Sequence, residues 1–169
     1  MKTILILLLS CSSLLAQKFA SIGDYGDSGS DELAVANLVK SWNPDFIITL
    51  GDNNYNEGLW STIDENIGQY FHEFIFPYIG SYGSGADTNR FFPSPGNHDH
   101  HNLDDLIYLQ PYLDYFDLFP YSGTTGNERY YDFVWGNVHF FSVNSCTIEP
   151  DGYKHPSVQS GWLETQLNN

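Results

Sequence analysis

Three short motifs of the chain, GDYG, GDNNY and GNHD, each follow an apolar run and carry side chains able to bind metals or move protons. These side chains are Asp24, Asp52, Tyr55, Asn97, His98 and Asp99. Carboxylate, amide and phenol oxygens suit hard or borderline metal ions, and a phenolate favours ferric iron. A carboxylate can bridge two metals, and metal pairs about 3.5–4 Å apart serve in-line displacement at phosphorus. The residue types therefore indicate a two-metal site.

Each motif also has an ordinary structural interpretation. Gly-Asp pairs and a single GNHD occur in turns, and a tyrosine after a strand is more often a half-buried packing residue than a ligand. Three such motifs in order, each after an apolar run, are harder to obtain from turns alone. The nearby Asp27, His100 and His101 are equally compatible with solvated side chains.

The elements that would position the motifs begin with a strand over Lys18–Gly23. A helix follows, capped by Ser28 or Ser30 and ended by Asn43-Pro44, and a second, fully apolar strand covers Phe46–Leu50. The predicted apolar face of the helix contains Val35, Leu38, Val39 and Trp42. A strand–helix–strand unit predicts parallel strands, and ligands of such sheets bind beyond the carboxyl ends of the strands.

Further elements follow along the chain. Thr62 and Glu65 form a predicted capping box, and a polar loop covers 80–89. The apolar face of the helix after that box contains Ile63, Ile67, Tyr70, Phe71 and Phe74. A short strand precedes GNHD, and Leu103–Leu118 is predicted to be helical with an interruption at Pro111.

The last part of the chain contains a predicted hairpin. Gly136-Asn137 forms its two-residue turn, between the apolar runs that flank it. A final helix begins at Ser160.

Composition limits the class of protein. The 169 residues are 41% hydrophobic and 17% aromatic, which argues for one folded domain rather than disorder. A formal net charge of -15 disfavours nucleic acid and anionic membranes as partners.

The first residues of the chain predict export. Residues 1–16 have the pattern of a signal peptide, so the mature domain would begin at residue 17 and be secreted or periplasmic. A lipoprotein anchored through Cys11 is the alternative. Cys146 would then be the single cysteine of the mature chain, without an internal disulfide partner.

The series GDYG…GDNNY…GNHD resembles the first three motifs of the calcineurin-like metallophosphoesterases. The tyrosine of the second motif makes the chain most similar to the purple (tartrate-resistant) acid phosphatase branch, and FFSVNS, EPDG and SGWLETQL are similar to segments of bacterial members. The resemblance implies an α/β fold, a β-sandwich flanked by helices in four αββα layers. It also implies that residues 17–169 are the N-terminal part of the domain.

The same resemblance implies a role for each motif residue in a dinuclear centre. Asp24 and Tyr55 would bind a ferric ion, and Asp52 would bridge it to a divalent ion, Fe, Zn or Mn. Asn97 would bind that second ion.

The catalytic roles implied by the resemblance belong to two residues. His98 would contact the phosphate and protonate the leaving oxygen. Asp99 would orient His98 through a hydrogen bond.

Two later motifs of the family, a histidine after a strand and a His-x-His pair, do not occur in the chain. They would lie beyond Asn169, because neither His139 nor His155 has a suitable context. We therefore expect an incomplete metal site and no competent catalysis from this stretch alone.

The sequence thus predicts an exported phosphomonoesterase of acid-phosphatase type, acting on a small phosphorylated substrate with a metal-activated water. A phosphodiesterase or nucleotidase on the same fold is the alternative within enzymes. A non-catalytic surface domain that binds calcium or glycans is the alternative outside them. The oligomeric state stays open.

Overall fold

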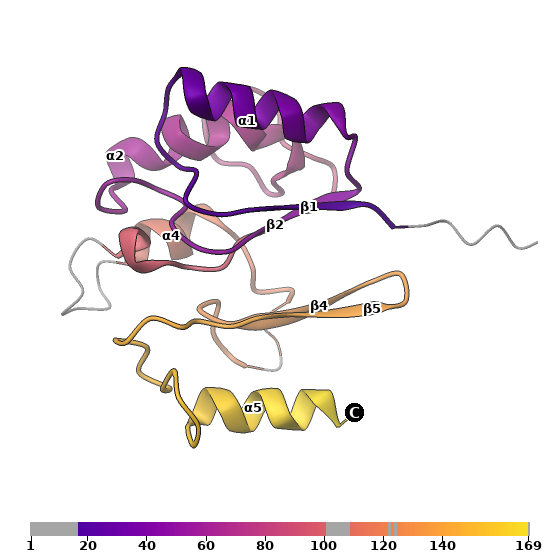
Figure 1. Cartoon of the computed structure of the whole chain (residues 1–169), viewed down its shortest axis with the longest axis vertical. Coiled ribbons are helices and arrows are strands. Elements are labelled where there is room, and N and C mark those ends of the chain that lie inside the picture. The colour runs from indigo at the N-terminus through magenta and orange to yellow at the C-terminus, as the bar shows by residue number, and fades with distance from the viewer. Residues whose placement is uncertain (1–16, 101–108, 122, 124, 169) are drawn as a thin grey trace, which may run out of the picture.

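The computed structural model describes residues 17–100, 109–121, 123 and 125–168. The predicted signal peptide with Cys11, the residue His101, and residues 103–108 of the predicted third helical segment lie outside this range. The described chain forms four layers (Figure 1), with helix α1 (Ser30–Ser41) above one sheet and helix α5 (Val158–Leu167) below a second. The order of layers is α, β, β, α, which confirms the predicted fold class.

The first sheet carries the three motifs. It contains β1 (Phe19–Ile22), β2 (Phe46–Thr49) and β3 (Phe91–Phe92), in the order β1-β2-β3 with every pairing parallel. The carboxyl ends of the three strands therefore meet at one edge, as the strand–helix–strand pattern predicts.

The second sheet is the predicted hairpin. Strands β4 (Tyr131–Trp135) and β5 (Val138–Ser142) pair antiparallel across a two-residue turn. Gly136 has a φ of 60° at that turn, a conformation that glycine adopts at little cost.

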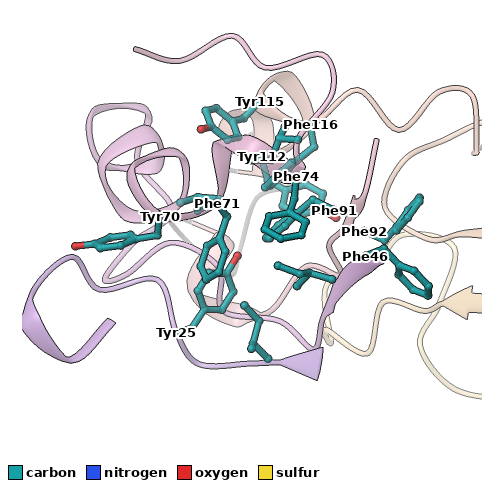
Figure 2. Close-up of a cluster of buried hydrophobic side chains, with 14 of the residues drawn as sticks. Tyr25, Phe46, Tyr70, Phe71, Phe74, Phe91, Phe92, Tyr112, Tyr115 and Phe116 are labelled. Atoms are coloured by element: carbon teal, nitrogen blue, oxygen red, sulfur yellow. The ribbon is translucent and has the colours of Figure 1, made fainter. Parts of the chain in front are cut away.

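Aromatic side chains fill the space between the two sheets. Phe92 stacks on Phe133 with ring centroids 3.7 Å apart, and Phe133 stacks on Phe140 at 5.0 Å. Figure 2 shows Phe46 and Phe92 on one side of the first sheet and Phe91 on the other, among the side chains of the helical layer. Adjacent residues of β3 thus serve two interfaces, because successive side chains of a strand point to opposite faces.

Helix α1 corrects two predictions. Its buried positions are Glu32, Ala36 and Val39, so of the predicted apolar face only Val39 is buried. The other three predicted positions are 42–53% exposed, namely Val35, Leu38 and Trp42. Gly29, without a side-chain cap, precedes the helix in place of the predicted serine caps. Ala36 and Val39 are 1% and 2% exposed, so the buried face of the helix is narrower than the periodicity predicts.

The next helical segment runs without a break from Trp60 to Phe74. It consists of α2 (Trp60–Ile63), a π turn (Asp64–Gly68), α3 (Gln69–Phe71) and a 3-10 turn (His72–Phe74). All five residues of its predicted apolar face are buried. The predicted capping box is wrong, because the helix begins before it.

Three shorter helical elements complete the described chain. Helix α4 (Gln110–Tyr115) contains Pro111 in its first turn instead of being interrupted by it, since proline suits the first turn. Ser157 caps α5 in a capping box with Ser160. The helix begins at Val158, two residues earlier than predicted. A 3-10 turn covers Asn97–Asp99. None of the helices within the described residues is long and apolar enough to cross a membrane.

Candidate metal centre

The loops after β1 and β2 are joined to each other by their backbones. The amide of Asp24 donates to the carbonyl of Gly51 at 3.2 Å, and the amide of Tyr55 donates to the carbonyl of Gly26 at 2.7 Å. A Cβ atom at Gly26 would collide with the backbone of Asn53, so only glycine fits there. The first two motifs therefore hold each other in place.

Asp24 and Asp52 share an unusual backbone conformation. Their φ angles are 51° and 54°, in the left-handed region that few residues other than glycine adopt. Such a conformation costs about 1–3 kcal/mol and is concentrated at functional sites. It turns each carboxylate out of the strand direction at the same edge of the sheet.

Tyr55 connects the two carboxylates. Its hydroxyl lies 3.0 Å from Asp24 Oδ1 and 3.3 Å from Asp52 Oδ2. Burial raises the pKa of Tyr55 above the usual range of a phenol, and its hydrogen bond to Asp24 and the charge of Asp52 add to this effect. Three oxygens that can ligate metal thus converge, with one phenol proton between two negative charges.

His98 is anchored to the same cluster. Its amide donates to Asp52 Oδ1 at 2.8 Å, and its ring lies 4.4 Å from the ring of Tyr55. The Nδ1 atom lies 2.7 Å from the carbonyl oxygen of Asn56. Because a carbonyl oxygen can only accept, Nδ1 carries a hydrogen and Nε2 is the nitrogen available to a substrate.

Asp99 does not play the part predicted for it. Its carboxylate accepts hydrogen bonds from the amides of Asn53 (3.0 Å) and Gly96 (2.7 Å) and from Asn53 Nδ2 (2.9 Å), whereas Asn56 orients the ring of His98. The 3-10 turn folds Asp99 back onto Gly96, away from the imidazole. Burial raises the pKa of Asp99 to about 7, against the opposing effect of those hydrogen bonds.

Asn97 is exposed and lies beside Asp52. The two residues line one open cavity of about 400 Å³, and the wall facing them is residues 145–147. Gly96 allows this approach, since a Cβ atom there would collide with Asp52. The structure therefore brings Asp24, Asp52 and Tyr55 into direct contact and places Asn97 beside Asp52.

The surrounding residues that the motifs left open differ from one another. Asp27 is exposed, whereas His100 is 3% exposed and neither of its ring nitrogens has a hydrogen-bond partner. Burial lowers the pKa of His100. His100 is therefore a buried neutral histidine, which contradicts the solvated alternative for this residue.

Two asparagines of GDNNY are structural residues that the motif search missed. Asn53 Nδ2 donates to Ser94 O and Asp99 Oδ2, and its Oδ1 accepts from Thr49 and Tyr25. Asn54 Oδ1 accepts from Thr62 Oγ1 at 2.8 Å. A turn after a strand does not require two adjacent asparagines. The pair Asn53-Asn54 was therefore the sequence signal that could have identified both as structural residues.

The donor chemistry of the site fits metal ions. Two carboxylates and a phenol converge, and an exposed amide lies next to the second carboxylate. A cluster of three or more His, Cys, Asp or Glu side chains spaced for a metal does not occur among the described residues. The oxygen donors of Tyr55 and Asn97 are therefore an essential part of any metal set formed here.

A sandwich of two sheets between helices, with carboxylates gathered where parallel strands end, defines a class of metal-dependent hydrolase domains. A family model described as calcineurin-like phosphoesterase matches residues 17–164, and the chain belongs to that family. The family is hydrolytic and generally uses a dinuclear metal centre. A comparison with curated proteins gives no match.

Proposed function

We propose that this chain carries the metal-binding part of an exported phosphomonoesterase of acid-phosphatase type. The observation that carries the proposal is the Tyr55 hydroxyl between the carboxylates of Asp24 and Asp52. An ordinary divalent centre needs no phenol at this position, whereas a ferric ion is well matched by phenolate.

The proposed assignment of ligands is the one that the family resemblance implies. Asp24 and Tyr55 would hold a ferric ion, Asp52 would lie between the two metals, and Asn97 would hold a divalent ion, Fe, Zn or Mn. When bound, the metal pair supplies an activated water and neutralises charge on the phosphoryl oxygens. His139 pairs with Asp132 in the hairpin at 2.7 Å, so its ring is engaged away from this edge.

His98 is the proposed proton donor to the leaving oxygen. Because Nδ1 faces the Asn56 carbonyl, donation from Nε2 requires the doubly protonated ring.

Substitution of His98 by alanine in the full-length protein tests this role. With alkyl phosphates we expect a loss of roughly 10²–10⁴-fold in kcat, the usual contribution of general acid catalysis. With p-nitrophenyl phosphate the loss should be much smaller, because that leaving group needs no proton. Equal losses for both esters would refute the role of His98.

Tyr55→Phe tests the ferric site independently of turnover. The full-length protein, isolated with iron, should absorb visible light through phenolate-to-iron charge transfer. The variant retains the ring and loses only the oxygen, so the band should disappear while the fold persists. An unchanged visible spectrum would rule out Tyr55 as a ligand and favour a divalent phosphoesterase, such as a phosphodiesterase or nucleotidase.

A further inference from the structure

The cavity beside Asp52 and Asn97 has three walls from distant parts of the chain. Residues 50–52 follow β2, residues 95–97 follow β3, and residues 145–147 follow β5. Its volume of about 400 Å³ lies within the range of small-ligand sites. The first two walls carry two of the proposed metal ligands, Asp52 and Asn97, which leaves 145–147 to face whatever the metals bind.

The third wall is held from behind by buried side chains. Asn144 is 1% exposed, and its Oδ1 accepts from the amide of Cys146 at 2.9 Å. Gln159 contacts Asn144 twice, accepting from its amide at 2.7 Å and donating to its carbonyl at 2.9 Å. Glu149 accepts from Asn144 Nδ2 at 2.8 Å, and Arg129 pairs with Glu149. Such support keeps a binding wall in one conformation.

A direct contact fixes this wall relative to the metal edge. The hydroxyl of Ser94, in the segment after β3, lies 2.7 Å from the hydroxyl of Ser142, the last residue of β5. The wall and the metal ligands therefore belong to one framework, although they come from different sheets.

The chemistry of the wall is polar and uncharged. Ser145, Cys146 and Thr147 contribute two hydroxyls and a thiol, and no lysine or arginine of the described chain lines the cavity. An ester whose alcohol part carries a second negative charge would find no cation here, in a chain of net charge -15. A neutral alcohol would find hydrogen-bonding groups.

We propose that residues 145–147 receive the alcohol part of the substrate, and that the site prefers phosphomonoesters of small neutral alcohols over esters with a second anionic group. This inference rests on the proposed function, because it takes Asp52 and Asn97 as the place where the phosphoryl group binds.

The first experiment measures protection of the Cys146 thiol in the full-length protein loaded with Mn²⁺. Iodoacetamide, a neutral reagent, alkylates the protein, and mass spectrometry of peptides follows Cys146 alone. Glycerol 2-phosphate should slow the alkylation at concentrations about tenfold lower than 3-phosphoglycerate requires. The Asp52→Asn variant should lose the protection. Ser41→Cys, at an exposed position of α1, provides a thiol that neither ester should protect.

The second experiment tests whether a positive charge on the wall reverses the preference for esters of neutral alcohols. Thr147 is exposed, so Thr147→Lys places a cation on the wall without disturbing the core, and Thr147→Ser is the matched control. Calorimetry should show that Thr147→Lys tightens 3-phosphoglycerate binding about tenfold relative to glycerol 2-phosphate. Thr147→Ser should keep the original preference.

The outcomes separate the two proposals. If both esters bind in an Asp52-dependent manner but Cys146 is alkylated at an unchanged rate, the alcohol part binds away from residues 145–147. In that case the proposed function stands and this inference is refuted. If both esters protect equally, the preference for neutral alcohols is refuted. If neither ester binds to the Mn²⁺-loaded protein, the proposed function fails and this inference fails with it.

Discussion

The aromatic interface between the sheets and the polar edge of the first sheet join distant segments by different forces. At the interface, Phe92, Phe133 and Phe140 stack over one another, and the contact depends on buried area and shape. At the edge, Asn53 uses both hydrogens and both sides of its side-chain oxygen in hydrogen bonds to four partners. The first kind of contact has little directionality, whereas the second specifies individual atoms.

The two regions therefore differ in the substitutions that they tolerate. A hydrophobic interface accepts substitutions that keep volume, since its energy is spread over many weak contacts. A buried polar cluster does not accept even an isosteric exchange, because one unpaired group costs more than a hydrogen bond contributes.

Asp52→Asn should have the largest effect at the polar edge. The variant keeps the left-handed backbone, which asparagine also adopts, but removes the charge proposed to serve both metals. We expect kcat/KM of the full-length protein to fall by at least about 10³-fold, with the urea unfolding midpoint little changed. Asp87→Asn, in the exposed loop before β3, is the control. Retention of wild-type activity by Asp52→Asn would mean that Asp52 is not the bridge.

Asn53→Asp tests the atomic specificity of the edge. The exchange is isosteric, yet it places a carboxylate 2.9 Å from that of Asp99 and removes the donor to Ser94. A loss of about 3–5 kcal/mol in the free energy of unfolding is expected, as for other uncompensated buried charges. Asn37→Asp, exposed on α1, should change stability by less than about 0.5 kcal/mol. Equal effects of the two substitutions would contradict the comparison.

Phe133→Ala tests the interface. Phe133 is 5% exposed and stacks on both Phe92 and Phe140, so the truncation should cost about 3–5 kcal/mol in the free energy of unfolding. The neighbouring Val134 is 64% exposed on the opposite face, and Val134→Ala is the matched control. Phe133→Leu should recover part of the loss, because leucine restores volume. Failure of leucine to recover any stability would show that the interface depends on ring geometry instead.

Glu32→Gln has the smallest expected effect. It tests a buried polar group that lacks the hydrogen bonds present at the polar edge of the first sheet. Glu32 lies on the buried face of α1 and is 4% exposed, and neither of its carboxyl oxygens has a hydrogen-bond partner. Burial, and then the charge of Asp27, raise the pKa of Glu32 to about 9 from an ordinary value of 4.5. The folded protein therefore holds this proton where the unfolded chain has lost it, and the free energy of unfolding falls as pH rises from about 5 towards 9.

The glutamine variant should lack this fall. Urea unfolding at pH 5 and pH 6.5 should show the variant gaining on the wild type by about 2 kcal/mol across the interval, because stability changes by about 1.4 kcal/mol per pH unit between the two pKa values. A constant difference between the two proteins at both pH values would show that Glu32 is ionised in the fold.

Local sequence patterns were enough to predict the parallel sheet, the hairpin and the edge at which the motifs meet. Unbroken apolar runs, a helix between two of them and a Gly136-Asn137 turn are local signals, and chain connectivity allows few arrangements of such units. The convergence of Asp24, Asp52 and Tyr55 follows from the same rule, because parallel strands end at one edge.

The sequence did not predict which face of α1 is buried or which residue Asp99 binds, because both depend on packing between distant segments. Of the apolar face that periodicity favoured on α1, the fold buries only Val39, and it buries Glu32 and Ala36 in addition. From its place in the sequence, Asp99 could hydrogen-bond to either His98 or Asn53. The 3-10 turn places its carboxylate at Asn53. The wall at 145–147 lies far from the motifs in sequence and near them only in space. Contacts between distant segments depend on how the two sheets pack, which no local pattern records.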